Sequence, residues 1–147
     1  MKNAEMALYS EDELDVLVSN AIRRAEILDE LGSPAAQDAW HEVMVYEERL
    51  ASILEPSALT GGIARVGSIL AAFAAGKRDE AVRLASRFLA EPSLPHERRA
   101  AIDRILKEDQ ERLELRYPAL ATKVRLSELQ QWRDEAAKQP RVFPLVA

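Results

Sequence analysis

The sequence predicts an all-α protein of about six helices, in which an N-terminal antiparallel helical hairpin packs against a helical bundle. Three observations lead to this fold class. Apolar residues recur at helical spacing through most of the chain, glycine is rare at 5 of 147 residues, and Gly or Pro falls between the periodic segments. Because 48% of the residues are hydrophobic, the chain can form one core, and we expect a single helical domain over residues 1–147.

The first helix is predicted to begin directly after Ser10. Ser10 and Glu13 have the spacing of a capping box, in which each side chain bonds to the backbone N–H of the other residue. Apolar residues follow at a 4-3-4-3 spacing, and Gly32 is expected to end the helix because it tolerates a left-handed conformation. The expected inward residues are Leu14, Val18, Ala21, Ala25 and Leu28, widened by Leu17, Ile22 and Leu31.

A second helix is predicted from Ser33-Pro34, as N-cap and first helical residue, to the residues just before Pro56. The connection between the two helices is very short, so they are expected to lie antiparallel as a hairpin. The expected inward residues are Ala36, Ala39, Trp40, Val43, Tyr46, Leu50, Ile53 and Leu54.

Residues 55–62 read Glu-Pro-Ser-Ala-Leu-Thr-Gly-Gly and give the strongest loop signal in the chain. We expect a joint between two subdomains here. A third helix is predicted over residues 63–75, with its bulky apolar residues facing the core. These expected inward residues are Ile63, Val66, Leu70 and Phe73.

Three further helices are predicted over residues 79–90, from 95 or 96 to about 116, and over 127–138. The tail at 140–147 contains two prolines and is expected to be extended rather than helical. Its apolar residues include Phe143. Three placements stay open for this tail: docking on its own domain, strapping a neighbouring copy, or serving as an exposed recognition peptide.

Residues 74–92 contain a turn glycine, Gly76, followed by the acidic pair Asp79 and Glu80 and by the small residue Ala81. This stretch resembles the middle of a tetratricopeptide repeat, a helical hairpin with these residue types around its turn. The helix before it lacks the aromatic and glycine positions of that family, and no second copy follows at a period of about 34 residues. The resemblance implies a helical hairpin here and a protein-binding scaffold without catalysis.

Charge is divided unevenly along the chain, whose net charge is −5. Residues 1–62 carry 4 basic and 13 acidic side chains, whereas residues 63–147 carry 16 basic and 12 acidic side chains. The two halves either neutralise each other within one domain or offer charged surfaces to a partner. The acidic balance, without interleaved basic and aromatic residues, argues against nucleic acid as that partner.

The candidate partner-binding residues are acidic residues of the first helix, arginines of the fourth and an aromatic residue of the tail. Arg83 and its i+4 neighbour form a basic face suited to carboxylates, although pairing within the helix, for example with Asp79, is the alternative. The full candidate set is Glu11, Asp12, Asp15, Glu26, Asp29, Glu30, Arg83, Arg87 and Phe143.

The residue types and motifs of the chain give little support for catalysis. The chain has no Cys, no Gly-x-Ser-x-Gly elbow and no glycine-rich phosphate loop, so we predict no catalytic, cofactor-binding or metal-binding residue and no cofactor. Asp38 and His41 lie on one face of the second helix with Glu48 two turns further on, which leaves a metal- or ligand-binding bundle as an alternative.

These observations together predict a non-catalytic protein–protein interaction module of the adaptor type, not an enzyme. The partner is expected to be another protein or a second copy, with no nucleic acid and no membrane, because no apolar run approaches the length of a bilayer span. The N-terminal residues lack a signal-peptide pattern, so a cytoplasmic location is expected. An immunity- or antitoxin-like inhibitor, whose acidic helices mask a basic effector, is a second hypothesis.

Overall fold

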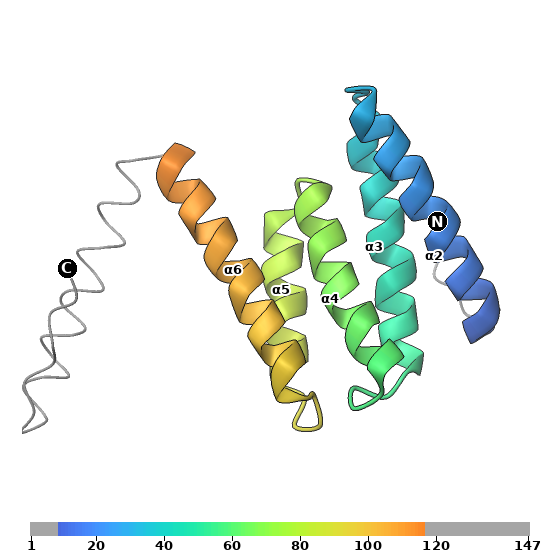
Figure 1. Ribbon diagram of the computed structural model, residues 1–147, viewed down its shortest axis with the longest axis vertical. Helices are drawn as coiled ribbons and strands as arrows, with labels where there is room; N and C mark the ends of the chain where they lie inside the picture. The colour runs from blue at the N-terminus through green and yellow to red at the C-terminus, as the bar shows by residue number, and fades with distance from the viewer. Residues whose placement is uncertain (1–8, 117–147) are drawn as a thin grey trace, which may run out of the picture. The chain divides into compact units, whose positions relative to one another are not determined.

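A computed structural model describes residues 9–116, which form five helices and no strand (Figure 1). The predicted all-α class is therefore confirmed. The expected helix at 127–138 and the tail at 140–147 lie outside the described residues. The helices are α2 (Glu11–Glu30), α3 (Ala36–Ile53), α4 (Leu59–Ala74), α5 (Arg78–Leu89) and α6 (His96–Arg116).

The chain divides into two compact units, Met1–Leu106 and Lys107–Ala147, and the division falls within α6. The segment 55–62, expected as a joint, lies inside the first unit. In that unit the large helix contacts join neighbours in the chain: α2 with α3, α3 with α4, and α4 with α5.

Helix α2 begins and ends as the sequence predicts. The backbone N–H of Glu13 donates to Ser10 Oγ at 3.2 Å, and the Glu13 carboxylate accepts from the Ser10 backbone N–H, which completes the capping box. Gly32 adopts φ +65°, and the N–H of Ser33 donates to the Leu28 carbonyl at 2.9 Å. These are the features of a Schellman ending. Leu31, expected on the inward face, is instead 74% exposed because it lies at this turn.

Helix α3 lies beside α2, joined by the Gly32 turn, as the predicted hairpin (Figure 1). It begins at Ala36 rather than at Pro34. Ser33 Oγ accepts from the Ala35 N–H at 3.1 Å, and the Ser33 carbonyl accepts from the Ala36 N–H, so a separate turn precedes the helix. Within the hairpin, the Trp40 indole N–H donates to the Asp29 carboxylate.

Helix α4 begins at Leu59 rather than at residue 63, so the expected loop at 55–62 is wrong over its second half. Gly61 and Gly62 lie inside the helix and are buried. A Cβ atom on Gly61 would lie 1.9 Å from the Glu55 carbonyl oxygen. Glycine therefore marks close contact with the preceding chain at this position, and not a flexible loop.

The predicted inward face of α4 is wrong for Ile63 and Leu70, whereas Val66 and Phe73 do pack against the core. Ile63 and Leu70 are about half exposed, and Val66 and Phe73 are partly buried. The opposite, small-residue face packs inward because it lets the backbones of neighbouring helices approach closely, which bulky side chains would prevent. The buried residues of α4 are Gly61, Gly62, Ala64, Arg65, Ser68, Ile69, Ala71 and Ala72.

Arg65 is the buried cation of this small-residue face, at 4% exposure. Its guanidinium donates two hydrogen bonds to the Glu91 carboxylate, at 2.6 and 3.0 Å, and a third to the Gly61 carbonyl at 2.9 Å. It also lies over the Phe88 ring, 5.5 Å from the ring centroid. The bidentate pair with Glu91 compensates the positive charge of Arg65, whose burial without a partner would be very unfavourable. The pair also links α4 to the segment that follows α5.

The turn between α5 and α6 is held by a second arginine. Arg99 donates to the backbone carbonyls of Leu89, Glu91 and Leu94. The last carbonyls of a helix have no partner within it, so the guanidinium supplies the donors that the end of α5 lacks. The predicted start of α6 near residue 96 is confirmed, and Ile102 is buried as expected.

We expect Gly61→Ala to lower the free energy of unfolding by about 2 kcal/mol, because the new Cβ forces the backbone at Glu55 to move. This loss exceeds the gain of about 1 kcal/mol that alanine brings to a helix. Urea denaturation measures the change. Gly62→Ala is the matched control, because its Cβ would meet the partly exposed, movable side chain of Arg98. Equal stability of the two variants would contradict the close contact at Gly61.

We expect Glu91→Gln to lower the free energy of unfolding by about 2–3 kcal/mol, because it leaves the Arg65 charge buried without its carboxylate. Glu80→Gln removes an exposed ion pair with Arg83 and should lower it by less than about 1 kcal/mol. The two values come from urea denaturation under the same conditions. An equal loss of unfolding free energy in the two variants would show that the buried Arg65–Glu91 pair stabilises the protein no more than an exposed ion pair does.

Candidate protein-docking surface

Helix α4 carries a row of large apolar side chains, here called the α4 stripe. Leu59, Ile63 and Leu70 are 66%, 52% and 50% exposed, and Val66 and Phe73 lie between or beside them, partly buried. The five residues follow one another at a 4-3-4-3 spacing and include no charged group. Single exposed apolar residues are common on protein surfaces, but a continuous row of them marks an interaction site.

The stripe faces outward because α4 is apolar on all sides. Arg65 is its one charged residue, and that residue lies on the buried face. A helix that is hydrophobic all round is normally enclosed on all sides. In the first unit the small-residue face of α4 takes the core positions against α3 and α5. On the bulky face, Leu59, Ile63 and Leu70 are exposed, whereas Val66 and Phe73 pack partly against the core.

The six acidic candidates on α2 are all exposed, but they are spread along the length of the helix. Glu11, Asp12 and Glu13 occupy its first turn, where negative charge is favourable near the helix N-terminus. Asp29 accepts a hydrogen bond from Trp40. The structure therefore shows acidic side chains spread along the exposed surface of α2.

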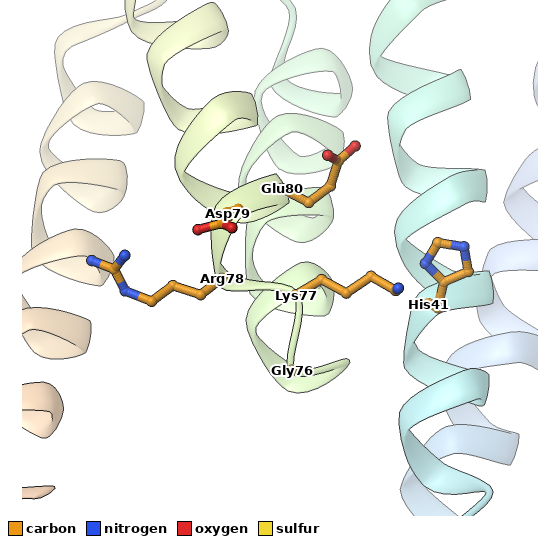
Figure 2. Close-up of a pocket in the computed structure, with 6 residues that line it drawn as sticks. All are labelled: His41, Gly76, Lys77, Arg78, Asp79 and Glu80. Carbon is orange, nitrogen blue, oxygen red and sulfur yellow. The ribbon is translucent and has the colours of Figure 1, made fainter.

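A hollow of about 530 Å³ lies where the α4–α5 turn approaches α3 (Figure 2). His41 faces it from α3, with Lys77 and Glu80 directed toward the ring and Arg78 directed away. His41 Nδ1 is buried without a hydrogen-bond partner. Cationic and anionic side chains both line this hollow, so its charge favours neither an anion nor a cation.

The arrangement of these helices gives no support to the alternative of a metal site. Among residues 9–116, no three His, Asp or Glu side chains come together to hold a metal ion. Glu48, expected as a possible ligand beside His41, instead accepts hydrogen bonds or ion pairs from α5. Within the same described range, no helix is long and apolar enough to cross a membrane.

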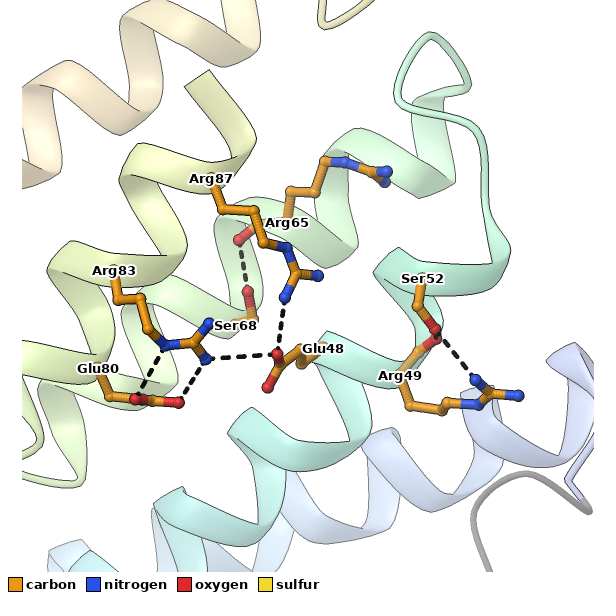
Figure 3. Close-up of polar contacts among 8 residues, drawn as sticks. All are labelled: Glu48, Arg49, Ser52, Arg65, Ser68, Glu80, Arg83 and Arg87. Atoms are coloured by element: carbon orange, nitrogen blue, oxygen red, sulfur yellow. Dashed lines mark hydrogen bonds and ion pairs between the residues drawn. The ribbon is translucent and has the colours of Figure 1, made fainter. Parts of the chain in front are cut away.

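Arg83 and Arg87 are half exposed and bind carboxylates of this chain (Figure 3). Glu48 on α3 lies 2.9 Å from Arg87 and 3.5 Å from Arg83, and Glu80 lies 2.6 Å from Arg83. The partner of Arg83 within α5 is thus Glu80, not the expected Asp79. The hydrogen bond from Arg83 lowers the pKa of Glu80, and the same bond raises the pKa of Arg83. The charges of Arg83 and Arg87 are therefore already compensated by Glu48 and Glu80 in the free chain.

Glu47 is a buried carboxyl that the sequence analysis did not single out. It is 6% exposed on α3, and its Oε2 lies 1.9 Å from the position a Cβ on Gly67 would take. Burial raises its pKa from 4.5 to about 7, and the negative charge of Asp15 on α2 adds to the shift. Its spacing from Val43 and Leu50 places it on the inward row of α3, and this signal was available in the sequence.

Phe143, the candidate in the tail, lies outside the described residues. Comparisons with known proteins find no matching family model, no matching curated protein and no matching solved structure. The resemblance of residues 74–92 to a tetratricopeptide repeat therefore stays a prediction. The α4 stripe is a feature that the packing of the described helices leaves unexplained.

We expect the stability of the protein to fall as the pH rises from about 4.5 to about 7 through the ionisation of Glu47. The unfolded chain releases this proton near pH 4.5, whereas the folded chain holds it to about pH 7, so the folded state loses up to about 3 kcal/mol over that window. Glu47→Gln should remove this part of the pH dependence and should be more stable than the wild type at pH 8.

Urea denaturation between about pH 4 and 8 measures the effect as the difference between wild type and variant. Glu26→Gln, an identical change at an exposed position of α2, is the control and should leave the profile unchanged. A Glu47→Gln profile parallel to that of the wild type would show that the carboxyl is ionised in the folded protein throughout.

Proposed function

We propose that this protein is a non-catalytic interaction module that binds an apolar helical face of another polypeptide along the α4 stripe. The observation that carries the proposal is the exposure of Leu59, Ile63 and Leu70 in one uncharged row. Laying an amphipathic helix along such a row buries both apolar faces, and this is a recurring mode of peptide recognition. Removal of apolar surface from water supplies the driving force, at about 25 cal/mol per Å².

The other candidate surfaces support this choice by comparison. Arg83 and Arg87 already bind Glu48 and Glu80, so an acidic partner would have to displace bonds that exist. The acidic residues of α2 are exposed and remain available as a charged rim that orients a partner. The tetratricopeptide-like features around Gly76 agree with a protein-binding scaffold, since this turn joins two helices that pack together, α4 and α5.

The proposal predicts that a partner touches Leu70 and not an equally exposed residue elsewhere. Leu70 on α4 and Ile27 on α2 are both 50% exposed, so they form a matched pair. A photoreactive benzoylphenylalanine at position 70 should yield, on illumination in the source cell, an adduct with a second polypeptide chain. The same residue at position 27 should yield none. Gel electrophoresis and mass spectrometry detect the adduct.

The proposal fails if position 70 gives no adduct, or if positions 27 and 70 give the same adducts in the same yield. In the first case the stripe meets no other chain, and in the second the contact is not specific to α4. A basic protein captured from both positions would instead favour an inhibitor whose acidic α2 covers a basic effector.

A further inference from the structure

We propose that Glu47 makes the packing of α2 on α3 sensitive to pH: α2 separates from α3 when the Glu47 carboxyl loses its proton, while α3, α4 and α5 stay together. This inference does not depend on the proposed function. It follows from the surroundings of Glu47, from the position of Asp15 and from the way in which α2 is attached to the other helices.

The carboxyl of Glu47 is enclosed between its own helix and α4, within reach of a like charge on α2. Glu47 is 6% exposed, and its Oε2 occupies the space that a side chain on Gly67 of α4 would fill. From α2, the negative charge of Asp15 acts on this carboxyl. Within residues 9–116, no hydrogen-bond donor offsets the effect of burial. A buried carboxylate without a donor or a cation is very unfavourable, so this environment favours the protonated form.

The cations of the neighbouring helices are bound elsewhere. On α4, Arg65 is the one charged residue, and its guanidinium is bound to Glu91. On α2, Arg24 pairs with Glu42. Among the described residues, the charged group that acts on Glu47 from another helix is therefore the carboxylate of Asp15, which opposes ionisation.

Helix α2 is the element that the ionised carboxyl would release. Among the described helices, its extensive contacts are with α3 alone, whereas α3 and α4 each contact two neighbours, and α2 lies at one end of the row (Figure 1). Helix α4 is also held by the ion pair of Arg65 with Glu91. Elements with few contacts open at a lower free-energy cost than the whole unit. Repulsion between Glu47 and Asp15 acts between α3 and α2, so the separation relieves it.

The size of the effect follows from the change in the pKa of Glu47. Packing raises this pKa from 4.5 to about 7, so the equilibrium constant for separation rises as the pH rises through this window, by up to about 300-fold. Below the window both forms are protonated, and above it both are ionised, so the constant changes no further. Between about pH 6 and 8 the expected rise is about tenfold.

Amide hydrogen exchange of the full chain, followed by NMR at about pH 6 and 8, tests the separation. The backbone N–H groups of α2 should be less protected than those of α4, because α2 opens while α4 stays packed. After correction for the intrinsic pH dependence of exchange, the protection factors of α2 should fall about tenfold over this interval.

Three variants assign the fall to its cause. Glu47→Gln cannot ionise, so its α2 protection factors should be the same at both pH values. Asp15→Asn removes the repulsion and should give a smaller fall than the wild type. Glu26→Gln, at an exposed position of α2, is the control and should keep the full fall.

Two results would overturn the inference. If the N–H groups of α2 and α4 are equally protected in the wild type, α2 does not open alone, although a pH dependence of the overall stability would remain. If the fall persists in Glu47→Gln, another group causes it. Neither result bears on the proposed function, which is tested separately by the photoreactive residue at position 70.

Discussion

The close approach of α3 and α5 to α4 is the constraint on which the rest of the first unit depends. Apart from Ile69 and Arg65, the buried surface of α4 is made of glycine, alanine and serine. These small residues let the neighbouring helices approach α4 more closely than larger side chains would allow. Glu47 fits inside because Gly67 has no side chain to meet it. Arg65 lies at the same depth and is stable there because Glu91 and the Gly61 carbonyl accept its hydrogen bonds. Both buried charged residues thus depend on small neighbours.

The same constraint explains why the protein has an apolar surface. A helix has a limited circumference, and α4 packs the face that carries its small residues against the core. Its bulky residues must then face outward, where Ile63 and Leu70 remain half exposed at a free-energy cost that folding alone does not recover. Helix α4 packs its small residues into the core, and its large residues form the surface that the proposed function assigns to a partner.

Much of the fold could be predicted because local signals decide it. The capping box at Ser10, the turn glycines Gly32 and Gly76, and the start of α6 all depend on backbone chemistry within a few residues. The orientation of α4 could not be predicted, because apolar periodicity locates the bulky face and does not reveal which face meets the neighbouring helices. Gly61 and Gly62 were misread as a loop for the same reason: their role is set by chain that lies close only after folding. The ion pair of Arg83 with Glu48 could not be predicted, because Glu48 lies on another helix.

The order in which the helices pack has a kinetic consequence. Each extensive contact joins helices that follow one another along the chain, α2 with α3, α3 with α4, and α4 with α5. Only short segments of chain have to be closed into loops, so little entropy is lost before native contacts form, and folding of such topologies is rapid.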